Sequence, residues 1–259
     1  MPRLLTDRDE VRELLRRNPE RHLLAIGDLD DAFWPHTQFL HGAGQTVLVY
    51  TGLQTPVVLA VADPPEPEMA AFAAACSGDL PDRFYGHLSG SAVEGLRPAY
   101  EVDVHATHAY MTLRPSDLPP PGEASGDEIT PIGEDDLEEI VQLQAAANPG
   151  GGFFEAGMLR AGPYRGVRRK GELVAMAGTH TWSAAERVAV LGNIATHPQH
   201  RRQGLAAAVT AALCAQLAQS VEMIGLTVDS ANVAAVGCYA GLGFTESATL
   251  FGAHCTRQA

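Results

Sequence analysis

The sequence is poor in cysteine, in basic side chains and in long apolar runs. Its 259 residues include only four cysteines, none of them in a C-x-x-C pair: Cys76, Cys214, Cys238 and Cys255. This spacing is typical of neither a disulfide framework nor a zinc site, so we expect buried free thiols and no metal. No run of about 18 apolar residues and no charged-then-apolar leader occurs, so we expect a cytoplasmic protein without a membrane span.

Basic residues are outnumbered: 18 lysines and arginines stand against 31 aspartates and glutamates, for a formal net charge of −13. An acidic chain repels nucleic acid and anionic membranes, and we expect it to bind neither. A phosphate-bearing small molecule would then need a local cationic site. The composition is otherwise ordinary for a globular protein, with 46% hydrophobic and 19% charged residues, and the length allows one large domain or two small ones.

A break in composition divides the chain almost in half. The segment 114–126, RPSDLPPPGEASG, contains four prolines and two glycines and can continue neither a helix nor a sheet. We therefore predict a linker at 114–126 between an N-terminal domain at 1–113 and a C-terminal domain at 127–259.

Each half mixes helices with strands. In the first half we predict helices near 6–17, 20–32 and 67–76, a hairpin of strands 46–51 and 56–62, and a strand at 101–113. Gly42-Ala43-Gly44 favours a turn over a dinucleotide loop, since no third glycine and no helix follow at the right offset. In the second half we predict strands at 127–131, 164–169, 173–182, 188–196, 223–228 and 245–254, and helices at 135–147, 153–161, 204–220 and 232–241.

This order predicts an α/β fold with a mixed sheet and helices on both faces. No sequence repeat is visible between the halves. The first half nevertheless has the outline of the second, and we expect it to be a smaller α/β domain and a degenerate copy of the same fold.

The most informative stretch is 192–213, GNIATHPQHRRQGLAAAVTAAL, a strand end, a short loop and an alanine-rich helix. The free amides of a first helical turn and the helix dipole favour an anion there. Gly204 lets a ligand approach the chain without a Cβ in the way. Arg201 and Arg202 add positive charge beside these amides. The stretch therefore predicts a phosphate site.

Two linked motifs resemble a known family. Arg201-x-x-Gly204-x-Ala206 is similar to the Arg/Gln-x-x-Gly-x-Gly/Ala signature of the GNAT superfamily of acyl-CoA-dependent N-acyltransferases. The run Asn232-x-x-Ala235-x-x-x-Tyr239-x-x-Leu242-Gly243-Phe244 resembles the family's final helix and the turn after it. The resemblance covers roughly 127–255. It implies a GNAT fold in the C-terminal half and acetyl-CoA, or another acyl-CoA, as the acyl donor.

The resemblance also assigns roles to residues. It implies that the backbone from residue 203 to 206 binds the diphosphate, with two arginines at the rim, and that the strand end pairs with the pantetheine arm. Tyr239 matches the tyrosine that can protonate the leaving thiolate, a role that suits a phenol with a pKa near 10. The implied cofactor-binding residues are Ile194, Ala195, Thr196, Arg201, Arg202, Gln203, Gly204, Leu205, Ala206, Asn232 and Tyr239.

The general base is where the sequence departs from the family pattern. Many relatives carry a glutamate on the strand before the phosphate loop, but Val188-Ala189-Val190-Leu191-Gly192-Asn193 contains no carboxylate. Asn193 could orient a water molecule. Glu155, His180 and Asp229 are alternative bases, and the sequence leaves the choice open.

We expect an N-acyltransferase, with acetyl-CoA as donor and the amine of a small molecule or an amino acid as acceptor. The stretches LLRRNPERHLLAIGDLDD and LTVDSANVAAVGCYAGLGF look like two-domain proteins of the glycine N-acyltransferase-like branch, which favours a small acceptor. The alternative is a catalytically silent acyl-CoA-binding module that has lost its base. The sequence leaves the oligomeric state open between monomer and homodimer.

Overall fold

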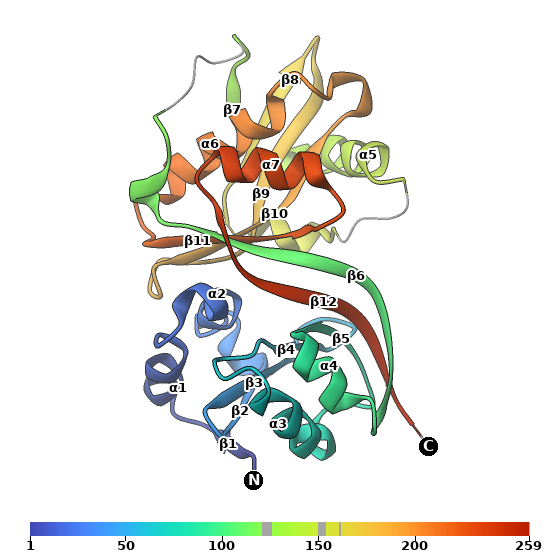
Figure 1. The fold of residues 1–259 in the computed structure, drawn as a ribbon. Coiled ribbons are helices and arrows are strands. Elements are labelled where there is room, and N and C mark those ends of the chain that lie inside the picture. Colours follow the sequence, from blue (N-terminus) through green and yellow to red (C-terminus); the bar gives the residue numbers. More distant parts are fainter. Residues whose placement is uncertain (121–125, 150–153, 161, 259) are drawn as a thin grey trace. The chain divides into compact units, whose positions relative to one another are not determined.

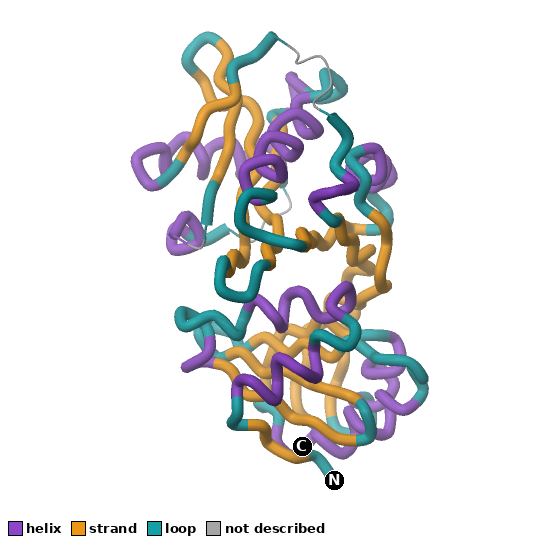
Figure 2. The backbone as a smooth tube through the Cα atoms, turned by 90° about the vertical axis from the view of Figure 1, so that its left-hand side faces the viewer, coloured by secondary structure: helices purple, strands orange, loops and turns teal. Residues whose placement is uncertain are grey.

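A computed structural model describes residues 1–120, 126–149, 154–160 and 162–258. The chain divides into two compact units (Figures 1 and 2). The first unit contains Met1–Met111, Thr227–Val233 and Glu246–Ala259, and the second contains Thr112–Leu226 and Ala234–Thr245. Part of the predicted linker, 121–125, lies outside the described residues. The domain limits drawn from the sequence stay a prediction.

The first unit is a mixed sheet with helices, as predicted. Strands β1 to β4 are antiparallel neighbours, β5 runs parallel to β4, and the last strand of the chain, β12, pairs antiparallel with β5. Its elements are β1 (Arg3–Leu5), α1 (Arg8–Leu15), α2 (Pro19–Gly27), β2 (Thr37–Gly42), β3 (Gln45–Tyr50), β4 (Val57–Ala60), α3 (Glu68–Cys76), β5 (Arg83–Leu88), α4 (Gly90–Leu96), β6 (Tyr100–Leu113) and β12 (Thr245–Arg257).

Local sequence signals explain several boundaries of this unit. Asp7 caps α1, because its carboxylate accepts bonds from the amides of Asp9 and Glu10. Ala43 and Gly44 both have positive φ, 50° and 74°, and form the turn that joins β2 to β3, as the predicted turn at 42–44 requires. Helices α3 and α4 pack at a glycine: a Cβ at Gly95 would lie 2.1 Å from the Ala70 carbonyl oxygen.

The second unit repeats this order of elements. It contains β7 (Ile129–Ile132), α5 (Leu137–Ala147), β8 (Tyr164–Arg169), β9 (Glu172–Ser183), β10 (Val188–Thr196), α6 (Leu205–Leu217), β11 (Met223–Asp229) and α7 (Val233–Gly241). Strands β7 to β10 are antiparallel neighbours, and β11 runs parallel to β10 after the α6 crossover, as β5 runs parallel to β4 after α3. The expectation of a repeated fold is therefore met at the level of topology.

The core of the second unit places α5 against the sheet. Ile140 and Leu143 of α5 pack against Met176 of β9 and Ala195 of β10. Helix α6 packs against β8, β9 and β10 through its own set of buried residues, Leu205, Val209, Thr210, Leu213, Cys214 and Leu217. The short helix predicted at 153–161 is a 3₁₀ helix, η5 (Ala156–Arg160), and the predicted ends, 153 and 161, lie outside the described residues.

All four cysteines are free, as expected, and three of them are buried; Cys238 is only half-buried. Within the described ranges, no helix is long and apolar enough to cross a membrane. The same part of the chain brings together no group of histidine, cysteine and carboxylate side chains that could hold a metal ion.

Candidate functional site

The turn between β10 and α6 has the geometry that an anion site requires. A 3₁₀ turn, η6 (Pro198–His200), follows β10, and both Arg202 and Gly204 then adopt left-handed conformations, with φ of 63° and 76°. The first amide of α6 to bond within the helix is that of Ala208, which donates to the Gly204 carbonyl. In the described residues no side chain caps this N-terminus, and its first turn carries no acidic residue. The amides of residues 205–207 are therefore available to a ligand.

The space in front of Gly204 is open. A Cβ built at this position would meet no atom within 4 Å, and residues 201–204 are exposed. The glycine is needed for its left-handed backbone, and the open space lets a bulky anion reach the amides.

The two arginines of this turn play different parts. Arg201 donates to the carbonyl oxygens of Ala147 at 2.8 Å and Thr196 at 3.4 Å, so its guanidinium ties the turn to the ends of α5 and β10. Arg202 is exposed. A third arginine, Arg169 on β8, donates to the side chain of Gln203 and is itself held by Asp127 at 2.7 Å. The turn is thus held in place by cations, which also make its surroundings electropositive.

The end of β10 has a free edge next to this turn. Its parallel pairing with β11 runs from Val188 opposite Met223 to Leu191 opposite Leu226, while the strand itself continues to Thr196. Beyond Leu191, the pairs that the described residues show are with β9 only. This free edge contains Ile194, Ala195 and Thr196, the residues for which the family resemblance implies pairing with the pantetheine arm. Main-chain groups on such an edge can pair with an extended ligand.

A polar network lies at the bulge where this edge begins. Asn193 has a positive φ of 54°, and its Nδ2 donates to the Tyr164 hydroxyl at 3.0 Å. The Asn193 carbonyl accepts a bond of 3.0 Å from Nε2 of Gln144 on α5. The backbone of Asn193 is therefore held by α5 and its side chain by β8. Sequence reasoning found Asn193 but missed Tyr164 and Gln144, since no local pattern marks partners 29 and 49 residues away.

The remaining sequence candidates are Glu155, Asp229 and Asn232. Glu155 is exposed just before η5. The residue of this helix that contacts Asn193 is Met158, whose sulfur lies 3.5 Å from Asn193 Nδ2. Asp229 accepts a bond of 2.9 Å from the Ala231 amide, which makes it a turn residue ahead of α7. Asn232 belongs, like Asp229, to the first unit. The roles of Glu155 and Asn232 stay predictions.

Tyr239 lies on α7 of the second unit. It is 7% exposed, and its ring packs edge-on against Phe244 at 6.1 Å between ring centroids. Burial raises the pKa of Tyr239 above its usual value, and nearby Cys238 adds to the rise. The phenol therefore stays protonated at neutral pH, as a proton donor must.

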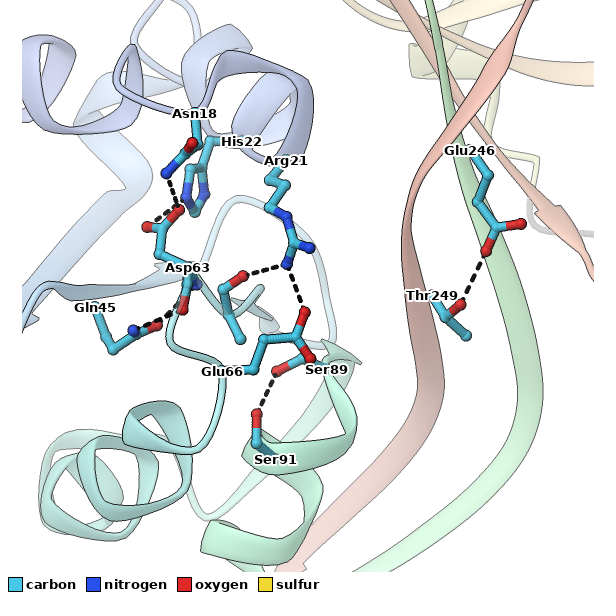
Figure 3. Close-up of polar contacts among 11 residues, drawn as sticks. Asn18, Arg21, His22, Gln45, Asp63, Glu66, Ser89, Ser91, Glu246 and Thr249 are labelled. Atoms are coloured by element: carbon cyan, nitrogen blue, oxygen red, sulfur yellow. Dashed lines mark hydrogen bonds and ion pairs between the residues drawn. The ribbon is translucent and has the colours of Figure 1, made fainter.

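The equivalent turn of the first unit, between β4 and α3, is closed (Figure 3). The amides of residues 68, 69 and 70 already donate to the carbonyls of residues 65, 66 and 67. Three prolines, at 64, 65 and 67, provide no amide at all. The carboxylate of Asp63 accepts bonds from Asn18 at 2.7 Å and His22 at 2.8 Å. This turn thus carries its own anion where the turn of the second unit is open.

Comparison with known proteins agrees with the predicted fold. Residues 133–244 match the model of the acetyltransferase (GNAT) family. No curated protein gives a significant match. Residues 133–244 are thus similar to the GNAT acetyltransferases, and this family suggests acyl transfer from an acyl-CoA.

Solved structures extend the likeness to the whole chain. A GNAT-family acetyltransferase from Novosphingobium aromaticivorans is 23% identical, with a TM-score of 0.62 over 93% of this chain and 98% of that chain. A Drosophila protein is 14% identical, with a TM-score of 0.71 over 98% and 97%. A tandem GNAT protein from the clavulanic acid biosynthesis pathway is 13% identical, with a TM-score of 0.54 over 99% and 98%. At these identities the likeness shows the fold alone, and that fold spans both units.

Proposed function

We propose that this protein transfers an acyl group, in the first place acetyl, from acyl-CoA to the amine of a small molecule or amino acid. The observation that carries the proposal is the open turn ahead of α6. Its uncapped amides, the left-handed Gly204 and the nearby arginines suit the diphosphate of coenzyme A. The acyl-CoA would supply the acyl group already activated as a thioester.

The residues of the second unit divide the remaining work. The backbone of Gln203, Gly204, Leu205 and Ala206 would hold the diphosphate, and the free edge at 194–196 would hold the extended arm and polarise the carbonyl. Tyr239 would give its proton to the departing thiolate. Net charge supports a small acceptor over nucleic acid, because an acidic chain repels phosphate polymers.

Isothermal titration calorimetry with coenzyme A tests this proposal directly. We expect micromolar binding, since a charged hydrogen bond contributes about 1.5–3 kcal/mol and several would form. An absence of binding at millimolar coenzyme A would defeat the proposal. The rival function, a silent acyl-CoA-binding module, is favoured by the lack of a carboxylate in residues 188–193. Binding without thiol release across a broad panel of amines would support that rival.

Stoichiometry provides a second test. We expect one coenzyme A per chain, although the chain repeats the fold, because the first-turn amides of α3 are already bonded to carbonyls and offer a diphosphate no donors. The calorimetric titration gives this number directly. A measured stoichiometry of two sites per chain would contradict the assignment of the first unit as closed.

The proposed proton donor gives a kinetic prediction. Tyr239→Phe removes the hydroxyl and keeps the ring that packs on Phe244. We expect kcat for thiol release to fall about 100-fold, the lower end for loss of a general acid, because water can donate in its place. Calorimetry on the same variant measures the Kd for coenzyme A, which should stay within about twofold because the ring that packs on Phe244 is kept. An unchanged kcat would remove Tyr239 from the mechanism.

A further inference from the structure

The imidazole of His180 occupies an unusual place on the sheet. Thr179 lies opposite Leu191 and Thr181 lies opposite Val190, so His180 is the extra residue of a bulge in β9. Its ring lies against the backbone of Gly192: a Cβ at that position would be 2.1 Å from both Cδ2 and Nε2. The ring therefore fills the space that any other residue at 192 would occupy, directly before the free edge of β10.

Nε2 of His180 is buried, and among the residues that the structure describes it has no hydrogen-bond partner. A buried polar atom without a partner is costly, so it calls for a reason. The nitrogen borders Gly192, the first residue of β10 beyond its pairing with β11 and two residues before the segment 194–196 that is proposed above to polarise the acyl carbonyl. A substrate at that edge would provide the missing partner.

The surroundings of His180 keep the ring neutral. Burial lowers the pKa of His180 below its usual value. A hydrogen bond with the Asn193 side chain raises this pKa in part, but burial has the larger effect. These two causes include no charged group. Tyr164 on β8, which accepts a hydrogen bond from Asn193, has a pKa raised by burial, so it is uncharged at neutral pH. A neutral imidazole has a lone pair that can accept a proton.

We propose that Nε2 of His180 is the general base that takes the proton of the attacking amine. This assignment rests on the N-acyltransferase function proposed above. The amine nitrogen forms a bond to the acyl carbon, the carbon–sulfur bond breaks, His180 receives the amine proton, and the thiolate receives the Tyr239 proton. The products are an amide and a free thiol. Solvent then carries the extra proton of His180 to the Tyr239 phenolate, which restores both side chains. Asn193 positions the ring and carries no proton.

The other candidate bases are less suited to this step. Asn193 has no basic atom, and its side chain donates to Tyr164 and Met158. The Asp229 carboxylate is engaged by the Ala231 amide, and Glu155 is exposed to solvent. His180 thus takes the place of the carboxylate that the strand before the phosphate loop lacks.

His180→Gln in the full chain tests the proposal, because glutamine keeps a polar side chain of similar reach without a base near neutral pH. We expect kcat for thiol release from acetyl-CoA with an amine panel to fall about 100-fold at pH 7. Wild-type kcat should fall in acid as the pH drops through the lowered pKa of His180, and this acid limb should be missing in the variant. His105→Gln, at an exposed histidine of the first unit, is the matched control and should leave kcat unchanged.

Each result has a separate meaning. An unchanged kcat in His180→Gln, or an acid limb that survives the substitution, would overturn the assignment. A wild-type protein that binds coenzyme A but releases no thiol with any amine of the panel would also overturn the assignment, while the proposal of acyl-CoA binding would stand. A wild-type protein that binds no coenzyme A would instead defeat the proposed function itself. Circular dichroism and the Kd of the variant for coenzyme A show whether the fold and the donor site are intact.

Discussion

Gly204→Asp is expected to raise the Kd for coenzyme A about 1000-fold. The new carboxylate would lie among the amides that hold the diphosphate, and two like charges about 4 Å apart near a protein surface repel by about 4 kcal/mol. The backbone should tolerate the change, since aspartate accepts a left-handed conformation better than most residues and a Cβ here meets no neighbour. Calorimetry with coenzyme A at fixed ionic strength provides the measurement.

Gly204→Asn is the matched control for this variant. Asparagine has the shape of aspartate and the same tolerance of the left-handed region, but it carries no charge. Its Kd should rise by about tenfold or less, so the difference between the two variants isolates the charge. Equal losses in both would show that bulk matters instead, and an unaffected Gly204→Asp would place the diphosphate elsewhere.

Asp63→Ala is expected to lower the free energy of unfolding of the first unit by about 3–5 kcal/mol, the usual cost of breaking a buried charged network. The Asp63 side chain is 14% exposed and joins α2 to the segment after β4 through Asn18 and His22 (Figure 3). Urea unfolding followed by tryptophan fluorescence measures the loss. Trp34 lies in the first unit and Trp182 in the second, so a Trp182→Phe background reports the first unit alone.

Asp82→Ala provides the control, because its carboxylate pairs with Arg257 of the first unit but is 82% exposed. An exposed pair contributes about 1 kcal/mol or less. If Asp63→Ala cost no more than Asp82→Ala, the network would not stabilise the unit.

The same network gives stability a pH dependence of known sign. Burial raises the pKa of Asp63, but its bonds to His22 and Asn18 and the charge of Arg21 outweigh burial, so the net pKa is lowered. Its contribution is therefore present above the unfolded pKa, about 3.9, and is lost as the pH falls through the lowered folded value. Wild-type stability should show this acid loss, and the same loss should be missing in Asp63→Ala.

Much of the fold could be read from local patterns. The apolar run at 188–191 marked a strand that the structure contains. Lys170 and Gly171, with φ of 52° and 87°, form the turn between the strands predicted at 164–169 and 173–182. Strands β1, β2 and β5 and helix α4 were missed. The sequence of α4, GSAVEGL, holds two glycines in seven residues and has low helix propensity, so its helix depends on packing against α3.

The amino-acid sequence by itself determined the open turn, because a strand, a left-handed glycine and a helix start are set by neighbouring residues. Only the tertiary structure showed that Asp63 is bonded at the related turn of the first unit and that Arg201 donates to main-chain carbonyls. It also showed that His180 lies on Gly192 and that its Nε2 has no partner in the described part of the chain. These features join residues that are tens of positions apart, up to 54 for Arg201 and Ala147. Such contacts follow from strand register and helix packing, which no local pattern encodes.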